Sequence, residues 1–138
     1  MRELLFRGQQ RRKGEKVRLD GSPLEGTWFY GSGVLQGKNR SIIYQSENGF
    51  DKHVVYTDTV GQYTGLTDKN GKKIFEGDII KGKGKNVYVV EYSENIAGFV
   101  TEGFGILCRP AVNTGTMCYY TVIGNIYDNP ELLGGGFE

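Results

Sequence analysis

The sequence contains few residues of the kinds that bind metals or act as nucleophiles. Cys108 and Cys118 are its two cysteines, and His53 is its single histidine. These three residues cannot build a four-ligand structural zinc site without carboxylates. We expect both thiols to be reduced, and a disulfide across a hairpin is the less favoured alternative. We predict neither a metal ion nor a cofactor.

Long apolar segments are also missing. No run of about 18 apolar residues occurs, so the sequence predicts no membrane-spanning helix. The basic start, MRELLFRGQQRRK, lacks the apolar region of a secretory signal. We therefore expect a cytoplasmic protein, without a membrane partner. The net charge of only +1 argues against a strong nucleic-acid binder.

Short enzyme motifs are absent as well. The patterns GxxxxGK[ST], GxGxxG, GxSxG and HExxH do not occur. Carboxylates at Asp68, Glu76 and Asp78 could in principle hold a hard cation, but turn capping explains Asp68 and Asp78 more simply. We predict no catalytic residue. An enzyme with an unrecognised site remains an alternative, with lower weight than a protein that acts by binding.

Glycine and β-type residues dominate what is present. Twenty-two glycines against three prolines favour many turns and bulges. No long window has helical periodicity, so we predict a mainly β protein with short antiparallel strands and little helix. One domain would span residues 1–138, with a small barrel-like part at 61–138 and a smaller N-terminal β subdomain at 1–60. The predicted strands cover residues 2–9, 16–19, 28–35, 41–45, 53–56, 60–63, 74–75, 79–80, 87–92, 98–102, 104–108 and 119–126.

Three local signals refine this prediction. Asn70-Gly71 predicts a two-residue type I′ turn between paired strands. Glycines 31 and 33 within an aromatic strand suggest a bulge or a close approach of backbones. Asn129-Pro130 is typical of a helix start, although a glycine run soon follows and allows only about one turn.

Charge is distributed unevenly along the chain. Residues 1–90 hold 16 of the 17 Lys and Arg and 10 of the 16 Asp and Glu, a balance of +6, whereas residues 91–138 have a balance of −5. The simpler interpretation is that the two halves neutralise each other within one fold. The alternative that we pursue is a homo-oligomer in which basic and acidic halves of neighbouring subunits meet, as in a ring, or else in a two-fold dimer. The candidate self-association residues are Trp28, Phe29 and Tyr30, with the segment 119–126 as a further candidate.

A basic run beside these aromatic residues suggests weak, salt-dependent binding of nucleic acid. The simpler interpretation is that the aromatic side chains are core and the charged ones a solvated face. The candidate nucleic-acid contacts are Arg7, Arg11, Arg12, Lys13, Lys83 and Lys85.

Three blocks stand out beside the opening Met1-Arg2-Glu3 with Phe6-Arg7: WFYG at 28–31, GQYTGLTDKNG with IFEGDI at 61–79, and VIGNIYDNPELL at 122–133. In these segments the sequence resembles the YopX family of bacteriophage and prophage proteins. The resemblance implies a small, β-rich, self-associating phage accessory protein in the host bacterial cell. It brings no catalytic residues and names no host or phage partner. Its alternatives are a nucleic-acid-binding small β-barrel and the enzyme mentioned above.

Overall fold

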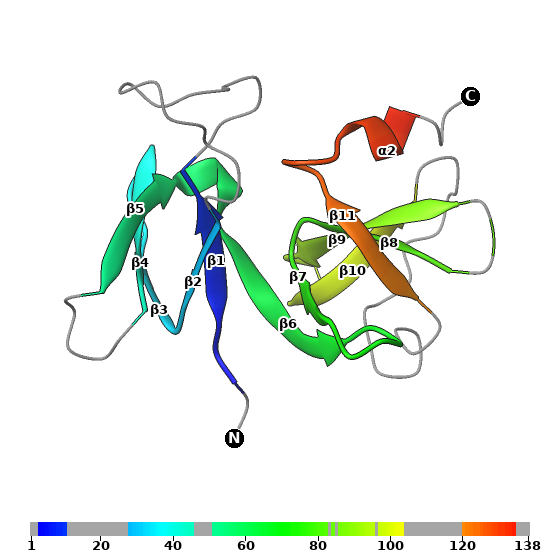
Figure 1. Ribbon diagram of the computed structural model, residues 1–138, viewed down its shortest axis with the longest axis horizontal. Coiled ribbons are helices and arrows are strands. Elements are labelled where there is room, and N and C mark those ends of the chain that lie inside the picture. Colours follow the sequence, from blue (N-terminus) through cyan, green and yellow to red (C-terminus); the bar gives the residue numbers. More distant parts are fainter. Residues whose placement is uncertain are drawn as a thin grey trace. The chain divides into compact units, whose positions relative to one another are not determined.

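The computed structural model describes residues 3–10, 28–45, 51–82, 84, 86–95, 97–103 and 120–134. The chain divides into two compact units, unit 1 at Met1–Gln62 and unit 2 at Tyr63–Glu138. Strands dominate both units, so the predicted mainly β class is confirmed (Figure 1). The predicted strands at 16–19 and 104–108, and both cysteines, lie outside the described residues. Within the described part of the chain, no helix is long and apolar enough to cross a membrane.

Unit 1 is built from strands and one 3-10 turn. They are β1 (Phe6–Gln9), β2 (Trp28–Gly31), β3 (Gly33–Leu35), β4 (Arg40–Tyr44), β5 (Lys52–Tyr56), η1 (Thr57–Thr59) and the start of β6 (Gly61–Thr67). β1 pairs antiparallel with β2 and with the first two residues of β6. β3, β4 and β5 form a separate three-stranded antiparallel sheet.

The two layers of unit 1 approach closely because glycines lie between them. A Cβ added to Gly8 would lie 2.5 Å from Cγ2 of Val55 on β5. A Cβ on Gly31 would collide with the carbonyl oxygen of Tyr44 on β4. Ile43 and Val55 are buried between the layers. The close backbone approach predicted at Gly31 is therefore confirmed.

Unit 2 holds the remaining strands and a single turn of α-helix. They are the rest of β6, β7 (Lys73–Phe75), β8 (Asp78–Lys81), β9 (Val87–Ser93), β10 (Gly98–Gly103), β11 (Thr121–Asn125) and α2 (Glu131–Gly134). β10, β9, β8 and β11 form a four-stranded sheet in that order, and β7 pairs with β6. This sheet is open, and no closed barrel is seen among the strands that the structure describes.

Both faces of the four-stranded sheet in unit 2 are covered. Neighbouring residues on a strand point to opposite faces, so Ile79 and Ile80 enter different clusters. Ile80 packs in a cluster with Ile74, Val90 and Val122. Ile79 packs with Val87 and Val89, and this second cluster is covered by Ile126, Leu132 and Leu133. The apolar doublets of β8 and β9 are thus buried on both sides.

The turn between β6 and β7 differs from the prediction. Gly71 donates its N–H to the carbonyl of Asp68, and Asp68 donates to the carbonyl of Lys72. Gly71 has a φ of +83°, whereas Asn70 does not have a positive φ. The loop therefore has three residues, 69–71, with a left-handed glycine at its end, which is the type I turn with a bulge. The predicted two-residue type I′ turn is wrong.

The β7–β8 connection is shorter, and it too is fixed by a left-handed glycine. Gly77 has a φ of +91° and is buried. Its N–H donates to the carbonyl of Val90, and its carbonyl accepts from the N–H of Ile126. A residue in the turn thereby bonds to two other segments of unit 2. The helix start predicted at Asn129-Pro130 is confirmed, since α2 begins at Glu131.

Candidate functional site

Most of the predicted nucleic-acid contacts fall outside the described residues; Arg7 is the exception. It lies on β1 and is only 5% exposed. Its guanidinium carbon lies 4.7 Å from the centre of the Trp28 ring. The structure therefore brings a predicted cation and a predicted aromatic residue together inside unit 1. The remaining candidates outside the described part of the chain are Arg11, Arg12, Lys13, Lys83 and Lys85.

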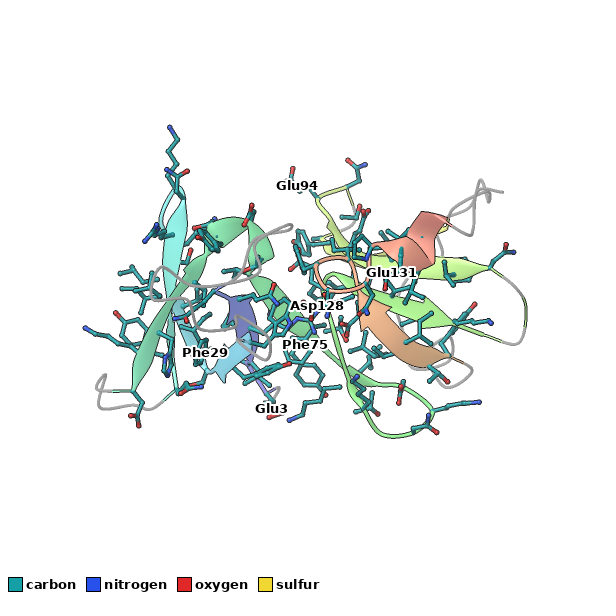
Figure 2. The ribbon with its side chains drawn as sticks, turned by 45° about the horizontal axis from the view of Figure 1, so that its top comes forward. Glu3, Phe29, Phe75, Glu94, Asp128 and Glu131 are labelled. Carbon is teal, nitrogen blue, oxygen red and sulfur yellow. The ribbon has the colours of Figure 1, made fainter. Side chains whose placement is uncertain are left out.

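The three aromatic residues predicted for self-association have different surroundings. Trp28 is half-buried beneath Arg7. Phe29, labelled in Figure 2, stacks on His53 with ring centroids 3.8 Å apart and planes 12° apart. Tyr30 is 43% exposed. Because the rings of Trp28 and Phe29 already pack inside unit 1, Tyr30 offers the most surface of the three.

The sequence analysis missed an apolar surface on the three-stranded sheet of unit 1. Leu35 pairs with Ile42, and Ile42 pairs with Val54, so the three side chains form one row across the sheet. Leu35 is 59% exposed, Val54 is 48% exposed and Ile42 is half-buried. We call these three residues the apolar row. Large exposed apolar side chains that adjoin one another are typical of interaction sites.

Two tyrosines and two cations flank the apolar row on the same side of the sheet. Arg40 pairs with Tyr56 at one end, and Tyr44 pairs with Lys52 at the other. The guanidinium carbon of Arg40 lies 5.7 Å from the centre of the Tyr56 ring. Cations and tyrosines therefore alternate at the four corners of the β4–β5 pair. We call this side the outer face, and its residues are Leu35, Arg40, Ile42, Tyr44, Lys52, Val54 and Tyr56.

A signal for the outer face was present in the sequence. β4 contains Ile42-Ile43 and β5 contains Val54-Val55. Continuous apolar runs are typical of strands that are buried on both faces. In unit 1 the described residues cover one face only, since Ile43 and Val55 are buried while Val54 is exposed. The two doublets could therefore have predicted an apolar outer face, as expected of a surface that a partner buries.

Two of the carboxylates considered for a cation site, Asp68 and Asp78, bond to backbone N–H groups instead. Asp68 is buried, and its Oδ1 accepts the N–H groups of Asn70 at 2.8 Å and Lys72 at 2.9 Å. Its Oδ2 accepts the N–H of Val122 at 3.0 Å. Oδ2 of Asp78 accepts the N–H of Phe75 at 2.8 Å. In the described part of the chain, no three His, Cys, Asp or Glu residues gather as a metal site would require.

These hydrogen bonds also set the charge state of Asp68. Burial by itself raises the pKa of this carboxyl, because it disfavours the charged form. The backbone N–H groups of Val122, Lys72 and Asn70, with the positive charge of Lys72, more than reverse this effect. The pKa of Asp68 is therefore lowered, and the side chain is held as an anion.

Acidic residues predicted to meet a basic surface are present in unit 2. Glu94 is exposed in the turn after β9, and Glu131 is exposed at the first position of α2 (Figure 2). Asp128 accepts a hydrogen bond from Nδ2 of Asn125 at 3.2 Å and so belongs to the turn before α2. Whether acidic and basic surfaces of neighbouring subunits meet stays a prediction.

The fold and the outer face define a small, mainly β protein with an exposed apolar sheet surface. The chain belongs to the YopX family: the family model described as YopX protein matches residues 6–134. The crystal structure of protein EF1440 from Enterococcus faecalis is similar, with a TM-score of 0.52 and 23% identity over 94% of this chain and 97% of that one. This likeness concerns the fold. A search of curated proteins found no match.

Proposed function

We propose that the protein is a phage- or prophage-encoded accessory protein of the host bacterial cytoplasm that works by binding, through self-association, rather than by catalysis. Membership of the YopX family supports this proposal, because the resemblance to that family implies a small, self-associating phage protein. The observation that carries the proposal is the apolar row on the outer face. Leu35 and Val54 expose large side chains on either side of Ile42, and burying this row against another molecule would be favourable.

The charge state of Asp68 supports a structural role for this carboxylate rather than a catalytic one. A general acid or base needs a pKa near the working pH, which is usually reached by raising that of a carboxyl. The lowered pKa of Asp68 is the opposite case, because backbone N–H groups hold the anion. The buried Asp78 likewise accepts a backbone N–H. Both carboxylates stabilise turns.

Light scattering at micromolar concentration, in low and in high salt, tests this function. We expect a particle heavier than the 15.4 kDa chain under both conditions. A monomer in both buffers would overturn the proposal. An oligomer that dissociates in high salt would favour contact between basic and acidic surfaces, whereas one that is indifferent to salt would favour the apolar row.

Binding of single-stranded nucleic acid is a second candidate function. Tyr44 and Tyr56 share the outer face with Arg40 and Lys52, and proteins that bind single strands combine aromatic platforms with cations. Gel shifts with single- and double-stranded DNA test it. Binding should be weak and should fall steeply as salt rises. Absence of binding at low salt would remove this candidate.

A further inference from the structure

We propose that two copies of the chain pack their outer faces together, with a two-fold axis that runs along the apolar row. The inference rests on the proposed self-association and names its surface and symmetry. The two sheets would form an aligned sandwich, in which side chains of facing sheets interdigitate about 10 Å apart. Leu35, Ile42 and Val54 of one subunit would lie against the same residues of the partner subunit.

Comparison of the two units within the chain supports a covered outer face. In unit 2, the doublets of β8 and β9 supply both faces of a sheet, and separate clusters bury each face. In unit 1, the doublets Ile42-Ile43 and Val54-Val55 supply both faces in the same way. Phe29 and Gly8 cover the inner face at His53 and Val55. The outer face has the same apolar residue types, yet Leu35 and Val54 are exposed in the single chain. Such exposure is expected of a surface that a second copy covers.

The four corners of the outer face make it complementary to itself. A two-fold axis along the apolar row exchanges the two ends of each strand. Arg40 then faces Tyr44 of the partner subunit, and Lys52 faces Tyr56 of the partner subunit. Each cation meets an aromatic ring, where the attraction strengthens as water is excluded. No cation meets a cation, so the contact avoids like-charge repulsion.

Other symmetric arrangements of two chains bury less of the apolar row. A two-fold axis parallel to the strands, between β4 and β5, also pairs cations with tyrosines. It places Leu35 beyond the edge of the facing β5, however, and leaves the most exposed apolar residue uncovered. The strands β3, β4 and β5 contain no Asp or Glu, so ion pairs within the contact are not available. Isologous packing along the apolar row buries the most apolar surface.

The first test replaces Val54, whose exposed side chain can change without disturbing the inner face. Val54→Lys places a charge beside the same charge of the partner subunit, and we expect self-association to weaken by about 100-fold or more. Light scattering should then give a mass near 15.4 kDa. The matched control is Ile123→Lys, a β-branched residue 38% exposed on β11 in unit 2, which should leave the oligomer unchanged. Circular dichroism checks that both variants fold.

The second test measures the position of the axis. Residues close to a two-fold axis lie near their own copies, so a short bifunctional thiol reagent should link Val54→Cys to the same residue of the partner subunit. Facing sheets about 10 Å apart are too far apart for a direct disulfide, which is why a reagent with a short spacer is used. Ile123→Cys adds the same number of thiols elsewhere, and it controls for Cys108 and Cys118. Non-reducing gels should show a linked dimer for Val54→Cys and much less for Ile123→Cys and the parent chain.

Each other outcome overturns a defined part of the proposal. A monomeric parent chain would overturn both the inference and the proposed function. An oligomer that survives Val54→Lys would overturn the inference alone, because self-association would then use another surface. A dimer broken by Val54→Lys but not linked by Val54→Cys would reject the two-fold axis along the row. Single-strand DNA binding lost in Tyr44→Ala and Tyr56→Ala, without any dimer, would assign the outer face to nucleic acid instead.

Discussion

One carboxylate organises the turn between β6 and β7. Asp68 bonds through Oδ1 to two N–H groups of its own loop and through Oδ2 to Val122 on β11. The next residue adds a main-chain bond, from the N–H of Lys69 to the carbonyl of Tyr120. A local turn is thereby attached to a distant strand of unit 2. Hydrogen bonds to a charged acceptor are stronger than neutral ones, so much of the turn's stability depends on this side chain.

Asp68→Asn tests that role. The amide keeps one acceptor oxygen but turns an NH₂ group toward backbone donors, so at least one buried N–H loses its partner. We expect the free energy of unfolding to fall by about 1–3 kcal/mol. Urea denaturation followed by circular dichroism measures it. Asp58→Asn, at an exposed position in η1, is the control and should change little; equal losses for both variants would contradict the assigned role.

The same variant should change how stability depends on pH. The pKa of Asp68 is lower in the folded chain than in the unfolded one, so its contribution is fully present above the unfolded pKa of about 4. It is lost as pH falls through the lowered, folded value. The melting temperature of the parent chain should therefore fall more steeply below about pH 4 than that of Asp68→Asn. Parallel profiles would show that Asp68 is not responsible for the acid sensitivity.

Gly31 tests the close approach of layers in unit 1. A methyl group there collides with the Tyr44 carbonyl and lies 2.9 Å from Cγ2 of Ile43, and β4 cannot move away without disturbing its sheet. We expect Gly31→Ala to destabilise the protein by about 1–3 kcal/mol. Gly33→Ala is the control, since its Cβ would come no nearer than 3.6 Å to Tyr44. A urea midpoint shifted equally by both substitutions would argue against the collision.

At the scale of single elements, much of the fold was predictable from local signals. Runs of β-type residues between glycine-rich turns identified most described strands, and Asn129-Pro130 identified α2. The turn at Asn70-Gly71 was placed correctly but given the wrong length. Both turn types require a left-handed glycine, and the choice between them depends on bonds from Asp68, including one to Val122 far along the chain. The residues around Asn70-Gly71 do not indicate the bond between Asp68 and Val122, which lies far away in the sequence.

The candidate site was less predictable than the fold. Aromatic residues such as Trp28 and Phe29 are common both in cores and at interfaces, and composition cannot distinguish the two locations. The structure shows their rings packed on Arg7 and His53. The outer face depends on register, because only the pairing of Leu35, Ile42 and Val54 brings three strands' apolar residues into one row. A shift by one residue would have turned each to the inner face.

The hairpin from β6 to β7 gives a prediction about backbone conformation. Gly71 has a φ of +83° and open space around it, so a side chain there costs conformational strain without a collision. Gly71→Val should lower the free energy of unfolding by about 1–3 kcal/mol. Gly84→Val is the matched control, since Gly84 is exposed, also has open space and lacks a positive φ. An unchanged melting temperature for Gly71→Val would show that the left-handed conformation is not required.

At the scale of the whole chain, each unit has a core of its own. Ile43 and Val55 are buried in unit 1, and two clusters fill unit 2. The single tryptophan, Trp28, lies in unit 1 and can report on that unit alone. β6 passes from one unit to the other, but its pairing with β1 ends at Gln62, inside unit 1. The pairing of β1 with β2 and β6 therefore uses no residue of unit 2.

We therefore expect the units to unfold separately in denaturant. Gly71→Val should shift the part of the circular dichroism transition that belongs to unit 2 and leave the Trp28 fluorescence transition in place. Gly31→Ala should do the reverse and move the fluorescence midpoint. If both probes follow a single transition in every variant, the units unfold as one cooperative body.

The position of Leu132 and Leu133 in the second cluster of unit 2 has a consequence for synthesis on the ribosome. All residues of unit 1 leave the ribosome before unit 2 is complete, so its layers can close early, as N-terminal units generally do. Ile79, Val87 and Val89 emerge long before the residues that cover them. We therefore expect the nascent chain to leave this apolar sheet face uncovered until α2 has been translated, and to be open to chaperone binding in that interval.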